Sequence, residues 1–326
     1  MKKKMNGLVK TFVFPIIIWV VFALIIQVHG GENIYVSVTS IKDIMQSSCL
    51  NVIVAIAVAL PLSGGRWDFA PGSIIVLTGI LAGNLVVEYK LGLIGLLLLS
   101  LAIASLLALF EGCIYIAFRV PTMIISLGIV MLYEALSGLV YDGSGVRLFM
   151  YENLAVFARQ PYCYIITVIV LAVFWIMMEY TKFGFDSRSL GNNAILAINN
   201  GVNEKKNILL TYLAVGMLLG VAAVLNASKA VVAPEANLGS TNLMFSSMGA
   251  VLVGLFLARY SNISLGLLSG TLAMSALSKG LTVYGLPASL NNIILGVFII
   301  VFMGCTTNMD ALRKRFVQRK IEGKIS

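Results

Sequence analysis

Charged side chains inside long apolar stretches are the residues of this sequence with the clearest potential for chemistry. Glu111 and Glu134 each interrupt such a stretch, and Lys279 lies toward the end of a third. A charge within a hydrocarbon layer is costly unless it meets a partner or water. Two carboxylates and an amine in these places could relay protons or sodium ions, as in an ion-coupled transporter. The alternative is a structural role in contacts with neighbouring helices or water.

Other residue types that carry chemistry are scarce, and their distribution argues against an enzyme. His29 is the only histidine, so a histidine-based metal site or triad is not expected. Four cysteines are far apart and lie in or beside apolar runs, which predicts small buried side chains and no redox or metal site: Cys49, Cys113, Cys163 and Cys305. The sequence also lacks the Gly-x-x-x-x-Gly-Lys-Ser/Thr loop that holds nucleotide phosphates. We expect no bound cofactor and no ATP hydrolysis by this chain.

The elements that position these residues must cross a membrane. The chain has 326 residues, of which 59% are hydrophobic and 11% charged, and its mean hydropathy is +0.96. Soluble domains carry about 25% charged residues. An apolar helix of about 20 residues spans the hydrocarbon core. The pattern predicts an all-α, polytopic membrane helix bundle of about ten transmembrane helices, at 11–28, 45–62, 72–88, 92–117, 122–141, 162–180, 208–227, 244–257, 263–281 and 289–305.

Basic residues set the orientation of these spans. With the N-terminus inside, 17 of the 23 basic residues fall in inner segments, as the positive-inside rule requires. We therefore predict that both termini are cytoplasmic, with 1–10 and 306–326 flanking a transmembrane domain at 11–305. The net charge of +9 is then mainly a topology signal, and nucleic acid is not an expected partner.

Glycines four residues apart recur within the spans, at 79 and 83, 216 and 220, and 266 and 270. In lipid, such pairs let two helix backbones approach closely. The spacing predicts a compact bundle and indicates no particular function.

The longest inner loop, 181–207, is polar enough to lie in water. Its middle carries a short helical apolar pattern at Ala194, Ile195, Ala197 and Ile198, which is too short to span the membrane. We predict a short amphipathic helix there, which either lies on the lipid surface or docks a partner protein.

A second polar interruption, "LPLSGGRWDFAPGSI" at 60–74, separates two predicted spans on the inner side. Gly64 and Gly65 permit backbone conformations that a helix does not. Pro71 suits the first turn of the following helix, and Asp68 could cap that helix start. A capped turn is therefore the simplest interpretation of this segment, which we call the break.

Four motifs in order resemble the permease subunits of bacterial ATP-binding-cassette importers for simple sugars and autoinducer-2, which are related to branched-chain amino-acid permeases. The resemblance covers about 47–306. The break matches at Gly64, Gly65, Asp68, Gly72 and Ser73, and "VPTMIISLG" matches at Val120, Pro121, Ile124, Leu127 and Gly128. The inner loop matches at Phe183, Gly184, Gly191, Asn193, Ala197 and Gly201. The fourth motif, "SSMGAVLVGLFLARYSNISLGLLSGTL", is less rich in glycine than is usual in the family.

The resemblance implies a permease of the bacterial cytoplasmic membrane that moves a small polar solute, with a simple sugar as the leading candidate. It implies three protein partners: a cytoplasmic ATP-binding subunit, an extracytoplasmic solute-binding protein and a second permease chain. The matching residues of the inner loop would couple the permease to the ATPase. The break would lie near the solute path and the contact between two permeases.

Departures from the family pattern are also informative. Relatives often carry arginine where this chain has Glu134, and a neutral asparagine near the position of Lys279. Two unusual charges of opposite sign favour an intramembrane ion pair between Glu134 and Lys279. The alternative is that each faces water or lipid headgroups separately. Arg66 and Trp67 of the break also depart from the pattern, and contact with the ATPase or with headgroups is one interpretation.

Overall fold

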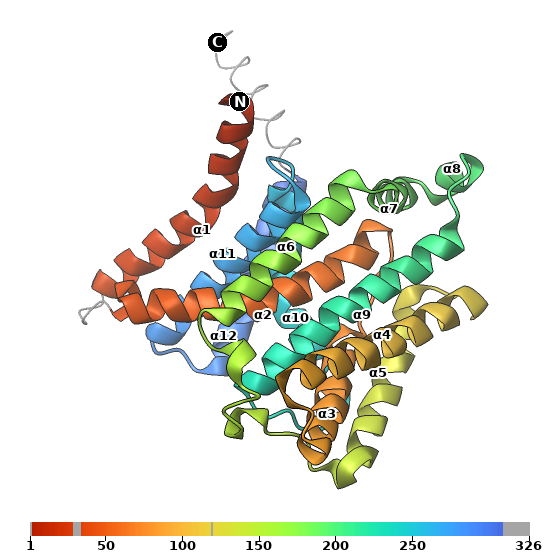
Figure 1. Ribbon diagram of the computed structural model, residues 1–326. Helices are drawn as coiled ribbons and strands as arrows, with labels where there is room; N and C mark the ends of the chain where they lie inside the picture. Colours follow the sequence, from red (N-terminus) through yellow and green to blue (C-terminus); the bar gives the residue numbers. More distant parts are fainter. Residues whose placement is uncertain (1, 29–33, 119, 309–326) are drawn as a thin grey trace. The chain divides into compact units, whose positions relative to one another are not determined.

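The computed structural model describes residues 2–28, 34–118 and 120–308, and these fold as helices joined by turns and short loops (Figure 1). Arg119, His29 and the predicted tail beyond 308 lie outside the described residues. Within them, each of the ten predicted spans coincides with a helix: α1 (Lys2–Val28), α2 (Val38–Ser63), α3 (Pro71–Tyr89), α4 (Gly92–Phe118), α5 (Thr122–Leu139), α6 (Tyr162–Tyr180), α9 (Glu204–Lys229), α10 (Thr241–Leu257), α11 (Ile263–Val283) and α12 (Ala288–Thr307).

Seven of the described helices are long and apolar enough to cross a membrane, namely α1 to α6 and α9. Two shorter apolar helices correspond to α10 and α12. The remaining helical segments are α7 (Lys182–Asn192), α8 (Ala194–Asn199) and four short 3-10 turns: η1 (Ile34–Val36), η2 (Val140–Gly143), η3 (Leu148–Met150) and η4 (Val156–Ala158). The chain is a polytopic helical bundle, as predicted.

The chain divides into two compact units, and each is described by itself. One unit comprises 42–251 and the other comprises 1–41 together with 252–326. The larger unit contains α3 to α9, most of α2 and most of α10. It also contains both segments that the sequence singled out, the break and the inner loop.

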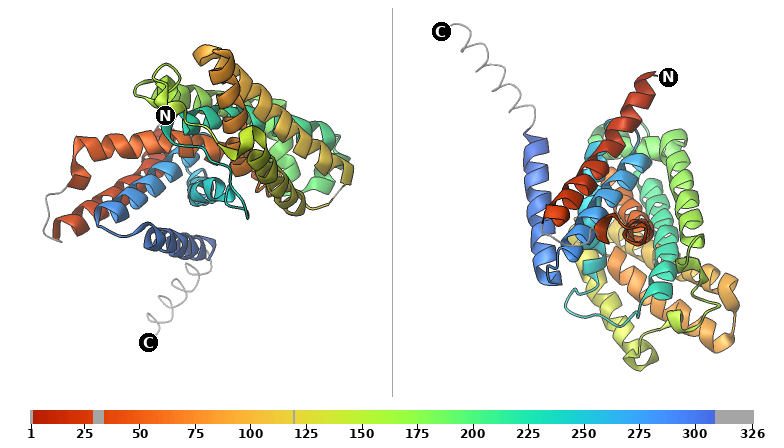
Figure 2. Two further views of the ribbon diagram at one scale, coloured as in Figure 1. Left: turned by 90° about the horizontal axis from the view of Figure 1, so that it is seen from below. Right: turned by 90° about the vertical axis from the view of Figure 1, so that its left-hand side faces the viewer.

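The antiparallel pair of α4 and α9 is the core of the larger unit, and the two helices lie side by side (Figures 1 and 2). Side chains added at Gly216 or Gly220 would press into the α4 backbone at Ser105 and at Ser100–Leu101. The predicted close approach of helices is therefore confirmed for this pair of glycines. The helix α3 packs against both α4 and α9, and also against α5.

Residues 230–240 form no helix, and this segment runs alongside α3. Val232 pairs with Val146 in an antiparallel bridge and lies beside Gly79, about half-way along α3. Eight residues later, Ser240 lies against Gly72 at the start of α3, so closely that a side chain at Gly72 would overlap its carbonyl oxygen. Because 230–240 runs beside about half of α3 without being helical, α10 begins only at Thr241. The predicted pair Gly79 and Gly83 thus faces mainly the side chains of Val232, Val146 and Leu148, which lie outside the long helices. A side chain at Gly79 would also lie 3.8 Å from Ala227 of α9, so one helix contact is present.

The smaller unit packs α1 against α11, with α12 beside α11. The Tyr35 hydroxyl donates to the carbonyl oxygen of Ala276 at 2.9 Å, and the Ser269 hydroxyl donates to that of Thr11 at 2.6 Å. Gly266 makes the predicted close helix contact, since a side chain there would overlap the Gly254 carbonyl of α10. Lys279 lies in α11 of this unit and is half-buried.

Candidate coupling segment and solute path

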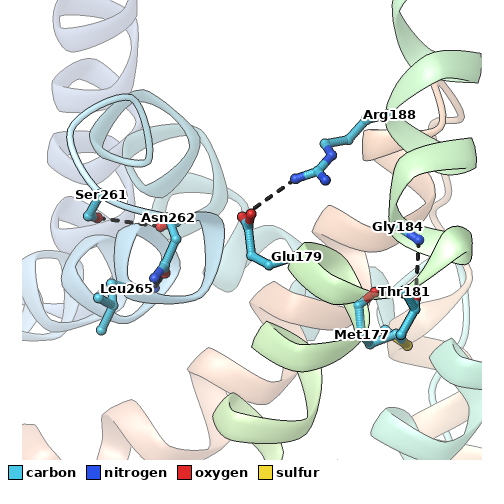
Figure 3. Close-up of polar contacts among 8 residues, drawn as sticks. All are labelled: Met177, Glu179, Thr181, Gly184, Arg188, Ser261, Asn262 and Leu265. Atoms are coloured by element: carbon cyan, nitrogen blue, oxygen red, sulfur yellow. Dashed lines mark hydrogen bonds and ion pairs between the residues drawn. The ribbon is translucent and has the colours of Figure 1, made fainter.

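The inner loop 181–207 folds as two short helices, each begun by a side-chain cap. The Thr181 hydroxyl accepts a hydrogen bond from the Gly184 amide at the start of α7 (Figure 3). At the start of α8, Asn193 Oδ1 accepts a hydrogen bond from the Leu196 amide at 3.0 Å. Glu179 also pairs with Arg188 across this corner at 3.5 Å. Capping by Thr and Asn satisfies amides that have no partner within the helix. The short amphipathic helix predicted at 194–198 is confirmed as α8, whereas α7 was not predicted.

The helix α8 presents its large apolar side chains outward. Ile195 and Leu196 are 75% and 59% exposed, and Ile198 is also exposed. Ala197, on the opposite side of the helix, is buried. An exposed apolar face on a helix this short is a surface for lipid or for another protein.

The residues assigned to coupling occupy distinct positions along this loop. Phe183 is half-buried on α7, and Gly184 is buried where a side chain would overlap the Met178 carbonyl. Asn193 caps α8, as above. Gly201 has a positive φ of 87° in the turn after α8, a conformation that favours glycine. The remaining matched glycine, Gly191, lies in the last turn of α7 beside the break.

The break begins with a tight turn at the end of α2. The amides of Gly64 and Arg66 both donate to the Pro61 carbonyl, and Gly65 has a φ of 76°. The backbone freedom expected of a glycine pair is therefore used at Gly65. The turn directs Arg66 into the protein, where only 4% of it is exposed. Trp67 is 39% exposed.

Arg66 connects the break to α7 and α9 through a buried polar chain. Its Nη1 donates to Asn207 Oδ1 at 3.4 Å, and Asn207 Nδ2 donates to the Ser187 hydroxyl at 2.9 Å. All three residues are buried. These contacts give Arg66 a partner inside the protein, whereas contact with the ATPase or with headgroups was one interpretation of the sequence.

Gly191 makes a second contact between the break and α7. A side chain at Gly191 would overlap the Ser63 carbonyl oxygen and would lie 3.3 Å from the Gly65 amide nitrogen. The break and the coupling segment, which the sequence identified as separate motifs, therefore form one continuous site.

Asp68 stabilises the break in a different way from the predicted helix cap. Its Oδ1 accepts from the Ala70 amide at 2.8 Å, which closes a turn before α3. The residue that precedes α3 is Ala70, which makes no side-chain cap, and Pro71 occupies the first turn as expected. Asp68 was expected to bond an amide of the helix itself. Asp68 lies two residues before Ala70, the residue that precedes α3, so its carboxylate closes a turn ahead of the helix.

A second buried carboxyl group lies near Asp68. Burial raises the pKa of the Asp68 carboxyl, while the hydrogen bond from Ala70 acts in the opposite direction. Glu111 of α4 faces it and is fully buried. The structure thus places one of the two intramembrane glutamates beside the break.

An Asp68→Asn variant should be at least as stable as the natural chain at pH 8. The folded pKa lies above the unfolded value, so the stability that this group contributes is present at low pH and is lost as pH rises through the folded pKa. Asparagine cannot ionise and can still accept from Ala70. In detergent, the difference in unfolding temperature between the Asp68→Asn variant and the natural chain should shrink as the pH is lowered toward 4. A variant clearly less stable at pH 8 would show that the ionised carboxylate is favourable in this site.

The opposite end of the break contacts the start of α10, where Glu134 is also bound. Ser240, which lies against Gly72, donates to Glu134 Oε1 from its amide at 2.9 Å and from its hydroxyl at 2.6 Å. The Leu238 amide donates to Oε2 at 2.9 Å. Glu134 is 5% exposed and lies within α5. Its carboxylate therefore satisfies two backbone amides of the non-helical segment at membrane depth.

The predicted pair of Glu134 and Lys279 stays a prediction. Glu134 belongs to the larger unit and Lys279 to the smaller one. Within the larger unit, both oxygens of Glu134 already accept hydrogen bonds. These bonds account for a carboxylate at this position whether or not the lysine adds a further contact.

Two hollows adjoin these contacts. One, of about 350 Å³, lies under α7 at the start of α9, and the other, of about 580 Å³, lies between α5 and residues 234–238. The first is lined by Lys182, Phe183, Asp186, Gly201, Asn203, Lys206, Asn207 and Leu210. The second is lined by Met131, Glu134, Ala135, Gly138, Pro234, Glu235, Ala236, Asn237 and Leu238.

Comparison with known proteins identifies the family. Residues 40–303 match the model of the branched-chain amino acid transport system permease component. The chain belongs to this permease family. It is 24% identical to the ribose import permease protein RbsC of Escherichia coli, over 82% of this chain and 85% of the relative. It is also 24% identical to the galactose/methyl galactoside import permease protein MglC of Haemophilus influenzae, over 96% and 98% of the two chains.

A third relative is the autoinducer 2 import system permease protein LsrC of Photorhabdus laumondii, 24% identical over 83% of this chain and 82% of the relative. No solved structure matches the chain. The relatives are transport permeases and not enzymes, and this permease is a multi-pass protein of the cytoplasmic membrane.

Several residues that build the site of this permease were not found from the sequence. Ser187, Asn207 and Ser240 become significant only through their partners, which are distant in the chain. A buried Asn near the start of an apolar helix was the one available signal, since Asn207 is the first residue before the predicted span at 208. Polar residues at span ends are common, so that signal alone does not identify a site.

Proposed function

We propose that this chain is the membrane-spanning permease subunit of an ATP-binding-cassette importer. It moves a small polar solute across the cytoplasmic membrane by alternating access, and a separate ATPase subunit supplies the energy. The observation that carries the proposal is the exposed apolar face of α8 on a loop whose other helix contacts the break. Membership of the permease family supports it.

In this proposal α7 and α8 couple the permease to the ATPase. Ile195, Leu196 and Ile198 dock into a groove of the ATPase, and Asn193 and Gly201 hold the two ends of α8. Movement of α7 reaches the break through the contact of Gly191 with Ser63 and through Arg66, Asn207 and Ser187. ATP binding and hydrolysis then shift the population between outward-open and inward-open states.

Two further protein partners are expected for an importer of this type. An extracytoplasmic binding protein delivers the solute, and a second permease chain, identical or similar, completes the path. The three relatives above are named for import of ribose, of galactose or methyl galactoside, and of autoinducer 2. We propose a simple sugar as the solute.

The α8 face provides the test of this function. In an Ile195→Glu, Leu196→Glu double variant, the docking face becomes charged, while Ala197 and the caps remain. We expect the tagged natural chain to co-purify with an ATP-hydrolysing subunit in stoichiometric amount, and we expect the double variant to lose it.

A Phe118→Glu variant is the matched control, because Phe118 is 69% exposed at the end of α4 and lies outside the loop. It should retain the ATPase. Equal retention by the natural chain and the double variant would contradict the proposed docking.

A further inference from the structure

We propose that the hollow of about 580 Å³ between α5 and residues 234–238 holds the solute during transport and favours neutral or cationic solutes rich in hydrogen-bond donors. This inference rests on the proposed transport function and adds the place and charge preference of the solute. The volume of the hollow lies within the range of small-molecule binding sites, about 300–1,000 Å³.

One wall of the hollow is non-helical backbone. Residues 230–240 run without helical structure beside α3, from about its middle at Gly79 to its start at Gly72. Non-helical backbone at membrane depth is tolerated only where it is buried in protein or lines a water-filled cavity. Val232 and Ser240 are buried, whereas Glu235, Ala236 and Asn237 between them are exposed. The exposed middle of the segment therefore indicates a cavity that admits water.

The wall formed by residues 234–238 is held in a fixed backbone conformation. Asn237 and Leu238 are both left-handed, with φ of 55° and 63°. Such conformations cost free energy in residues other than glycine and persist only where surrounding contacts impose them. Glu134 imposes them here by accepting from the amides of Leu238 and Ser240.

The side chains that line the hollow are acidic and polar on one side and apolar on the other. Two carboxylates, Glu134 and Glu235, and the side-chain amide of Asn237 contribute polar groups, and none of the described residues that line the hollow is basic. Met131, Ala135 and Gly138 supply an apolar wall on α5. Carboxylates accept hydrogen bonds from hydroxyl or amine groups and repel anions. The lining thus suits a polyhydroxylated or cationic solute and disfavours an acidic or phosphorylated one.

The hollow also connects to the break. Ser240 is bound to Glu134 on one side and lies against Gly72 on the other. Movement of the break would therefore shift the wall that carries Asn237.

Cysteine accessibility tests the inference without knowledge of the solute. The four native cysteines are replaced, and Ala236→Cys is compared with Ala172→Cys, an exposed position in the middle of α6. A cationic and an anionic methanethiosulfonate are the probes. In each reaction the cysteine thiolate attacks the reagent sulfur, a mixed disulfide forms and methanesulfinate leaves.

We expect Ala236→Cys to react and Ala172→Cys to stay largely unreactive. The ratio of cationic to anionic rates at 236 should exceed that of a small free thiol by about tenfold, as for a difference of about 1.4 kcal/mol. An added Glu235→Gln substitution should lower this excess. D-ribose or D-galactose at high concentration should slow the reaction at 236, and D-galacturonate should not.

Equal reactivity at 236 and 172, or a preference for the anionic probe, would overturn the inference. So would the absence of protection by both neutral sugars. These outcomes are separate from the ATPase test, because cysteine labelling requires no partner protein. If the hollow reacted and preferred the cationic probe in a chain that binds no ATPase, the proposed energy source would be refuted and the inference about the hollow would stand.

Discussion

A Gly191→Val variant should lose at least about tenfold in ATP-driven transport while it still binds the ATPase. A valine at 191 would overlap the Ser63 carbonyl and press on the Gly65 amide, so α7 or the break must move. Overpacking of this kind costs about 1–3 kcal/mol, and about 1.4 kcal/mol corresponds to a factor of ten. The docking face of α8 is unchanged. Transport and co-purification of the ATPase, measured on the same membranes, check this result.

Gly128→Val is the matched control, since a side chain at Gly128 meets no atom within 4 Å among the described residues. It carries the same change in a motif that the resemblance also matches. Transport by Gly191→Val at the natural rate would show that the contact of α7 with the break does not transmit movement.

A Glu134→Ala variant should be less stable by about 3 kcal/mol, because three donors lose a charged acceptor, and hydrogen bonds to charged groups contribute about 1.5–3 kcal/mol each without being additive. The Leu238 and Ser240 amides would remain buried and unpaired. We expect a lower unfolding temperature in detergent and loss of transport. The Glu134→Gln variant keeps one acceptor oxygen, so its unfolding temperature and its transport should fall less than those of Glu134→Ala.

Double-mutant cycles separate the possible partners of Glu134. The cycle with Ser240→Ala should give a coupling free energy, because the two side chains are hydrogen-bonded at 2.6 Å. The cycle with Lys279→Ala tests the ion pair predicted from the sequence. Coupling to Lys279 and none to Ser240 would contradict the role of Glu134 in holding the start of α10.

The spans were predictable from the sequence because each depends on local composition. An apolar stretch such as 162–180 forms a helix of the same bounds, since length and hydropathy alone determine what crosses a membrane. Local patterns also predicted α8 and the position of Pro71 at the start of α3. These features require no knowledge of which residues meet in space.

The contacts of the site could not be predicted, because they join residues distant in the chain. Nothing near Arg66 in the sequence indicates Asn207, and nothing near Glu134 indicates Ser240. The non-helical path of 230–240 was also missed. The pattern showed only that the next span is short, and the reason emerges from packing against α3.

These contacts form a continuous physical connection within the larger unit. It runs from α7 through Gly191 and Arg66 to the break, then from Gly72 to Ser240, and ends at Glu134 beside the hollow. Contiguity alone does not demonstrate energetic coupling, which the variants above measure directly. Under the proposed function, this connection would let movement of the inner loop change the shape of the hollow.

The energy source of transport tests the central claim most directly. Uptake of labelled D-ribose and D-galactose is compared in cells with and without this chain, and the chain-dependent part is measured under two treatments. We predict that it stops when ATP is depleted and the ion gradients are maintained, and that it continues when the gradients are collapsed and ATP is maintained. Uptake that survives loss of ATP and stops with the gradients would contradict the account and favour an ion-coupled transporter that uses Glu111, Glu134 and Lys279.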